Sequence, residues 1–132
     1  MDISSIDIEC DLHKIYQYMS NITNINEWSI GIHWDITNDK IVQGISSYDD
    51  SISYLKIVKN DKIKKVDYWI GEDISDLVPR IYIRVLPTED KKRNKLKMVA
   101  FRSDNMDDER WKRLKDAHQS ELITIREILC SK

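Results

Sequence analysis

The last quarter of the chain, residues 107–129, repeats apolar residues with a period of 3.6. Asp107, Asp108 and Glu109 stand at its start, where acidic groups suit the positive end of a helix dipole. A helix with so broad an apolar side needs a surface to pack against, and we expect the preceding residues to supply it. The apolar stripe, typical of an amphipathic helix, comprises Trp111, Leu114, Ala117, Leu122, Ile125, Ile128 and Leu129.

The region from residue 32 to residue 102 has strand patterns instead. A further alternating segment at 3–9 predicts a first strand, and it precedes two short helical patterns at 12–20 and 22–31. Strands that follow one another without helices between them pair most simply as antiparallel neighbours. The six segments rich in β-branched and aromatic residues are 32–36, 41–45, 52–58, 64–70, 79–86 and 96–102.

The predicted order is therefore one strand, two short helices, six strands and one long helix. This order predicts an α+β fold, in which a curved, seven-stranded antiparallel sheet wraps around the C-terminal helix. A curved sheet that grips one helix often leaves a space between them, and such clefts are the usual small-molecule sites. At 132 residues, the chain fits a single domain over residues 1–132.

Composition excludes several classes of protein. The chain is 41% hydrophobic and 33% charged, as ordinary globular proteins are. Its formal net charge of −2 argues against a nucleic-acid partner, because such proteins usually carry a basic excess. The first residues lack a basic segment followed by an apolar run, and no segment approaches the ~20 apolar residues of a membrane span. We therefore expect a cytoplasmic protein without an integral membrane segment.

The sequence indicates neither a metal site nor a cofactor. Cys10 and Cys130 are far apart without a CxxC partner, and the histidines do not have the HExxH spacing. A Gly-rich phosphate loop, a nucleophile elbow and a dinucleotide fingerprint are absent too. We expect free thiols, no metal and no cofactor.

Two residues inside the apolar stripe of the last helix are candidates for chemistry. His118 and Glu121 stand three apart on the helix, so their side chains can meet. In a cavity, a carboxylate that holds an imidazole could tune it as a general acid or base near neutral pH. The plainer alternative is a structural hydrogen bond at the edge of the stripe.

Large side chains with polar tips are candidates for the lining of a pocket, because they combine an apolar body with a hydrogen-bonding group. Tyr68 and Trp69 are neighbours on one strand, so at most one of them can face a cavity. Arg84 could pair with a ligand carboxylate or phosphate, although packing and solvated positions are the plainer roles for such residues. The predicted ligand-binding set is Trp34, Tyr54, Trp69, Tyr82, Arg84, Met98, Trp111, Leu114 and Leu122.

Three stretches of sequence resemble one superfamily. They are the opening strand that runs into Asp11-Leu12-His13-Lys14-Ile15-Tyr16, the turn Asn26-Glu27-Trp28, and Glu121-Leu122 in the closing helix. With the order of elements, they resemble the START-like or SRPBCC superfamily, the helix-grip fold of polyketide cyclases, plant pathogenesis-related proteins and Hsp90-ATPase-activator-like proteins. The resemblance implies a hydrophobic cavity between the long helix and the sheet, used for lipids, sterols, hormones, polyketides or other bulky apolar ligands.

Three functions follow as hypotheses. The first is the binding of a hydrophobic or aromatic small molecule, such as a lipid or a polyketide-like compound, in this cavity. The second is an enzyme of the polyketide cyclase or dehydratase type, which would use His118 and Glu121 in the same cavity. The third is a co-chaperone-like interaction module, which would need an exposed apolar patch and a filled interior. The protein would be a monomer or a homodimer.

Overall fold

A computed structural model describes residues 1–37, 40–89, 92–104 and 106–130. The order of its elements is the predicted one. A single 3-10 turn, η1, separates the two short helices. The elements are β1 (Asp2–Ile8), α1 (Leu12–Ser20), η1 (Ile22–Asn24), α2 (Ile25–Trp28), β2 (Ile32–Asp35), β3 (Ile41–Ser46), β4 (Ile52–Asn60), β5 (Lys65–Gly71), β6 (Val78–Pro87), β7 (Asn94–Ala100) and α3 (Asp108–Cys130).

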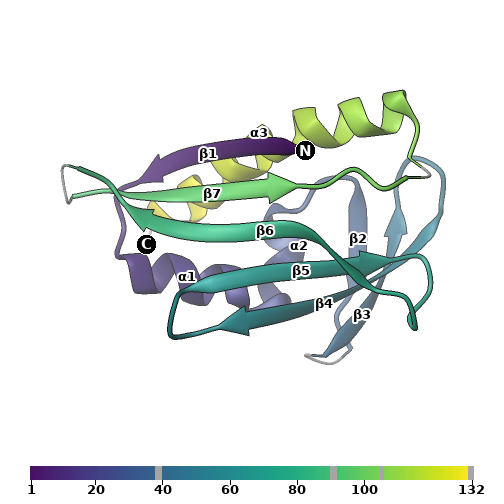
Figure 1. Ribbon diagram of the computed structural model, residues 1–132, viewed down its shortest axis with the longest axis horizontal. Coiled ribbons are helices and arrows are strands. Elements are labelled where there is room, and N and C mark those ends of the chain that lie inside the picture. Colours follow the sequence, from purple (N-terminus) through teal and green to yellow (C-terminus); the bar gives the residue numbers. More distant parts are fainter. Residues whose placement is uncertain (38–39, 90–91, 105, 131–132) are drawn as a thin grey trace.

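The seven strands form one antiparallel sheet in the order β1-β7-β6-β5-β4-β3-β2. Each strand from β2 to β6 pairs with the next strand along the chain, whereas β1 pairs with β7, with Ile6 opposite Leu96. Figure 1 shows that the sheet is curved and that the helices lie on one side of it. The prediction of an α+β helix-grip fold is confirmed.

Helix α3 begins and packs as its sequence predicts. The side chain of Asp107 accepts a hydrogen bond of 2.7 Å from the backbone N–H of Arg110, and Asp108 and Glu109 occupy the first turn. The second half of the helix buries Leu122, Ile125 and Leu129 against β1 and the rest of the core. Its other side is exposed. Within the described residues, neither this helix nor any other combines the length and the apolar character that crossing a membrane requires.

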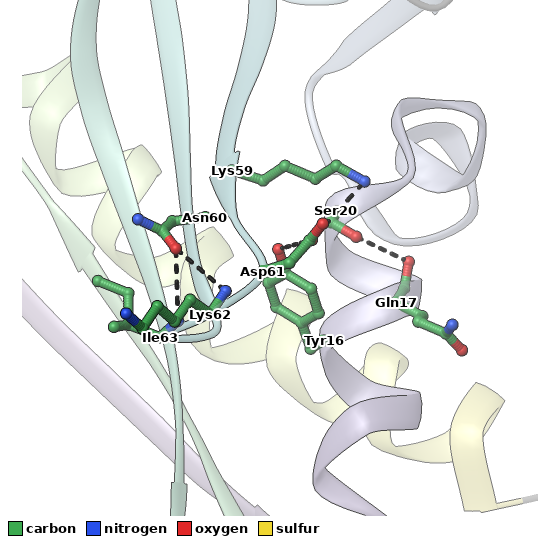
Figure 2. A network of polar contacts seen from close by, with 8 residues as sticks. All are labelled: Tyr16, Gln17, Ser20, Lys59, Asn60, Asp61, Lys62 and Ile63. Atoms are coloured by element: carbon green, nitrogen blue, oxygen red, sulfur yellow. Dashed lines mark hydrogen bonds and ion pairs between the residues drawn. The ribbon is translucent and has the colours of Figure 1, made fainter.

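Two tyrosine hydroxyl groups hold α1 to the sheet. Tyr16 donates a hydrogen bond of 2.5 Å to Asp61 in the hairpin between β4 and β5, and Lys59 lies 3.9 Å from the same carboxylate (Figure 2). Tyr68 of β5 donates a hydrogen bond of 2.8 Å to the backbone carbonyl of Met19. These contacts fix the end of α1, and therefore also the position at which η1 and α2 begin.

Candidate functional site

A cavity of about 410 Å³ lies between α3, the α2 segment and the inner face of the sheet. This volume falls within the range of roughly 300–1,000 Å³ that is usual for small-molecule pockets. Strands β2, β4, β5, β6 and β7 all contribute to the wall. Its apolar part includes Trp28, Leu55, Ile70, Phe101, Trp111 and Leu114.

Glu121 is the most strongly perturbed acid in this wall. Its side chain is only 6% exposed, and Oε2 accepts a hydrogen bond of 2.8 Å from the backbone N–H of Ile30. Burial raises the pKa of Glu121 to about 8, and the hydrogen bond from Ile30 opposes this rise only in part. At neutral pH, the cavity therefore contains a protonated, uncharged carboxylic acid.

His118 lies one turn earlier on α3 and is 4% exposed. Its Nδ1 atom is 3.7 Å from a carboxylate oxygen of Asp2 in β1, which is too far for a hydrogen bond. This nitrogen has no hydrogen-bond partner among the described residues. Burial lowers the pKa of His118, although Asp2 acts in the opposite direction. The imidazole is therefore neutral at pH 7.

His118 and Glu121 both line the cavity, but each turns to a different partner. In the described ranges, no hydrogen bond joins the two side chains: the nearest acid to the imidazole belongs to Asp2, and the carboxyl group binds Ile30. Spacing along the helix allowed a contact, but groups on other elements compete for both side chains. The imidazole and the carboxylic acid in the cavity wall therefore do not form a hydrogen-bonded pair.

Trp34 contributes its ring to the same wall, with its indole N–H buried inside the protein. It is 3% exposed, it lines the cavity, and its Nε1 has no acceptor among the described residues. Its backbone is fixed by the Asn26 side chain, which donates a hydrogen bond of 2.7 Å to its carbonyl and accepts one of 2.9 Å from its N–H. The indole ring rests against Gly44, where a Cβ atom would come within 2.5 Å of Cε3. Gly44 therefore leaves the space that the ring occupies.

The charged side chains of the wall are less buried than its neutral polar groups. The acids among them are exposed and the two arginines are half-buried. Two positive and three negative residues give a formal sum of 2 − 3 = −1. The cavity therefore has no strong field of one sign. The five residues are Glu72, Asp73, Asp76, Arg80 and Arg110.

The structure brings only part of the predicted site together. Met98 and Leu122 are 1% and 0% exposed and belong to the hydrophobic core, without lining the cavity. Both are packed by neighbouring apolar side chains. The predicted residues that line the cavity are Trp34, Trp111, Leu114, His118 and Glu121.

The other four predicted residues lie on the outer face of the sheet, away from the cavity lining. Tyr54 is on the face of β4 opposite to the cavity-lining Leu55. Trp69 lies beneath the ammonium group of Lys56, 5.0 Å from its ring centroid. Tyr82 and Arg84 contact each other, with 5.2 Å between the guanidinium carbon and the ring centroid, on the face opposite to the buried Ile83. These side chains do not line the cavity beneath α3.

Tyr68 and Ser53 are among the other residues that line the cavity; Tyr68 was weighed against Trp69 in the sequence, whereas Ser53 was not considered. A signal for Tyr68 was present: Val66 and Ile70 share its face, whereas Trp69 shares its face with the polar Lys65 and Asp67. Ser53 carries no comparable signal, because a serine in a strand is equally common on a solvated face. Its position opposite Gly44, in the neighbouring strand, places it in the wall.

No protein-family model matches the chain, and the search of curated proteins found no match either. Solved structures, in contrast, match almost all of it. A START superfamily protein from Mycobacterium smegmatis has a TM-score of 0.65 and 6% identity, with 98% of this chain and 96% of that chain covered. The Aha1 dimer from Colwellia psychrerythraea has a TM-score of 0.63 and 12% identity, with coverage of 97% and 94%.

A third structure is the di-domain ARO/CYC BexL from the BE-7585A biosynthetic pathway. It has a TM-score of 0.62 and 11% identity, and the match covers 96% of this chain and 46% of that chain. Similarity at these identities is similarity of fold. The chain has a START-like, or SRPBCC-like, helix-grip fold, as its sequence predicts.

Proposed function

We propose that this protein binds a hydrophobic or aromatic small molecule in the cavity between α3 and the sheet. The observation that carries the proposal is the cavity itself, about 410 Å³ in volume with a largely apolar and aromatic wall. Apolar ligand surface moved there from water contributes about 25 cal/mol per Å². Such a cavity supports ligand binding over the co-chaperone-like interaction module, which requires a filled interior.

Native mass spectrometry of the purified protein, followed by denaturing extraction, tests the proposal directly. We expect a retained apolar compound, or, if the protein is empty, binding of the neutral fluorescent probe N-phenyl-1-naphthylamine. Ala117→Phe places a ring in the cavity and should abolish probe binding. Asp116→Phe is the matched control, because the neighbouring Asp116 is exposed on the same helix and does not line the cavity. An empty protein that ignores the probe would refute ligand binding.

One observation favours a second candidate function, an enzyme of the cyclase or dehydratase type. A neutral imidazole and a protonated carboxylic acid line the same cavity, so His118 could accept a proton while Glu121 supplies one. Turnover of a polyketide-like substrate that His118→Gln abolishes, with the fold and probe binding intact, would establish this enzyme. Unchanged turnover in the variant would exclude a catalytic role for His118.

A further inference from the structure

We propose that the outer face of the sheet, the side on which no described helix lies, docks on anionic lipid membranes (Figure 1). The proposal goes beyond ligand binding, because it concerns the side of the sheet opposite to the cavity and applies equally to an empty protein. It is based on two neighbouring rows of side chains that the register of the strands creates on this face, one cationic and one apolar.

The cation row consists of Lys65 in β5, Arg84 in β6 and Lys97 in β7. The register places Lys65 opposite Arg84, and Arg84 opposite Lys97. Like charges directly opposite one another in a sheet repel and are destabilising. Asp67 relieves part of this repulsion, since its carboxylate lies 3.0 Å from Arg84 and 3.7 Å from Lys65. Lys97 forms no ion pair with the described residues, so an external anion would lower the electrostatic energy of the row.

Two further cations flank the row on the outer face, Lys95 in β7 and Lys56 in β4. The outward-facing acids beside these five cations are Asp67 and Asp7, which lies opposite Lys95. The local formal sum is 5 − 2 = +3, on a chain whose net charge is −2. Positive charge is therefore concentrated on this face of an otherwise acidic chain, and it complements an anionic surface.

An apolar row lies beside the cations, in the next row of the register. Ile3 and Val58, at its two ends, are 54% and 43% exposed, and Leu86, on the other side of the cation row, is 46% exposed. On an anionic membrane, exposed apolar side chains enter the boundary between headgroups and acyl chains, while Lys and Arg bind the headgroups. Apart from Asp67 in β5, the members of the apolar row are Val58, Tyr82, Val99 and Ile3.

These contacts favour a membrane over a nucleic acid. Single-stranded nucleic acids would use the same cations, but they also need aromatic rings on which their bases can stack. On this face, the ammonium group of Lys56 lies over the ring of Trp69, 5.0 Å from its centroid. The guanidinium group of Arg84 lies over Tyr82 in the same way, at 5.2 Å. Bases would have to displace these cations, whereas a lipid surface uses the cations and the exposed aliphatic groups together.

Co-sedimentation of the full chain with lipid vesicles tests the proposal. In about 50 mM NaCl, where exposed charges are weakly screened, we expect strong discrimination between two kinds of vesicle. Vesicles of equal parts phosphatidylcholine and phosphatidylglycerol should bind the protein roughly tenfold more tightly than phosphatidylcholine alone. Salt at about 500 mM should remove most of this preference. Equal binding to both kinds of vesicle, or binding to neither, would overturn the proposal and leave ligand binding in the cavity intact.

A charge-reversal pair locates the docking surface. Lys95→Glu combined with Lys97→Glu should weaken binding to the anionic vesicles roughly tenfold or more, because each Lys or Arg near such a surface contributes about fivefold. The matched control is Lys112→Glu combined with Arg126→Glu, which changes the net charge equally at two exposed positions of α3. The control should retain most of the binding. If it loses as much as the first pair, net charge explains the binding and the proposal is wrong.

Lysine acetylation of the wild type gives a second measurement that does not depend on the folding of a variant. With anionic vesicles present, Lys65, Lys95 and Lys97 should react more slowly with a water-soluble reagent, whereas Lys112 and Lys115 on α3 should keep their rates. Protection of the α3 lysines instead would overturn the proposal.

Competition identifies the alternative partner. Single-stranded oligothymidylate should displace the protein from the vesicles only at a phosphate concentration well above that of the anionic lipid. Displacement at a lower concentration would assign the face to nucleic acid and overturn membrane docking.

Discussion

Glu121 accepts a hydrogen bond of 2.8 Å from the backbone N–H of Ile30, and this contact joins α3 to the turn that follows α2. The turn continues through Gly31, whose φ of +89° favours a residue without a side chain, and then enters β2. One buried carboxyl group therefore fixes a loop and lines the cavity at once. Its protonation state should accordingly affect both stability and binding.

The first prediction concerns the pH dependence of stability. In the folded protein, the pKa of Glu121 is about 8, above the ordinary value of 4.5 that applies to the unfolded chain. The unfolded state thus releases its proton at lower pH, so the free energy of unfolding should fall as pH rises from about 4.5 to 8. The loss is on the order of a few kcal/mol. Glu121→Gln removes it, because the amide does not ionise.

Urea unfolding of the wild type and of Glu121→Gln at pH 5 and pH 8 tests this prediction. The variant should gain stability relative to the wild type at the higher pH. The difference between the two proteins isolates Glu121 from the charged or titratable groups around the cavity, which are common to both. A difference that is the same at both pH values would contradict the raised pKa. The charged or titratable groups around the cavity that both proteins share are Asp2, Tyr68, Glu72, Asp73, Asp76, Arg80, Arg110 and His118.

His118 should give the free energy of unfolding the opposite dependence on pH. Burial lowers its pKa in the folded state below the ordinary 6.5, so the folded protein resists protonation that the unfolded chain accepts. The stability that it contributes is complete above about pH 6.5 and is lost as pH falls through the folded-state pKa. His118→Gln should therefore lose less stability than the wild type between pH 7 and pH 5. Equal losses in denaturant titrations of the two proteins would exclude this contribution.

The main features of the fold could be predicted from periodicity alone. Alternation in the strands and the 3.6-residue repeat of α3 report burial, and burial decides which elements pack together. Even the start of the last helix, at Asp108, lies within one residue of the start that its acidic residues indicate. These signals are local, so one sequence is enough to detect them.

The site depends on information that is not local. Sequence spacing placed His118 beside Glu121, but the decisive partners, Asp2 and Ile30, lie about 90 or more residues away in the chain. Similarly, the residue type alone does not show on which face of a sheet an aromatic residue such as Trp69 lies. The apolar neighbours Val66 and Ile70 favour Tyr68 as the ring that faces the cavity, and the register of the strand, which shifts between Tyr68 and Trp69, fixes the outcome.

The outer-face residues provide a test of their separation from the cavity. Arg84 forms a 3.0 Å ion pair with Asp67 and lies against the ring of Tyr82. Because the group is partly solvated, Arg84→Ala should lower the free energy of unfolding by only about 1 kcal/mol. Affinity for N-phenyl-1-naphthylamine should remain within twofold of the wild type. A large loss of affinity in the folded variant would place Arg84 in the binding site after all.

Substitution of Gly44 tests whether the position of the Trp34 ring determines ligand binding in the cavity. Alanine is intrinsically better than glycine in a strand by roughly 0.5–1 kcal/mol, so a plain strand position would gain stability from Gly44→Ala. At this site, however, the new Cβ would lie 2.5 Å from Trp34 Cε3 and 2.6 Å from Ile32 Cγ2.

We therefore expect Gly44→Ala to cost about 1–3 kcal/mol instead, as overpacked cores do, and to displace the indole ring. Affinity for N-phenyl-1-naphthylamine should then fall, because the displaced ring changes the shape of the cavity wall. Gln43→Ala is the control, since Gln43 lies on the same strand with its side chain exposed. Thermal unfolding and probe titration of both variants provide the comparison. If Gly44→Ala is as stable as the wild type and binds the probe equally well, the ring of Trp34 has room to move, and its position does not determine binding.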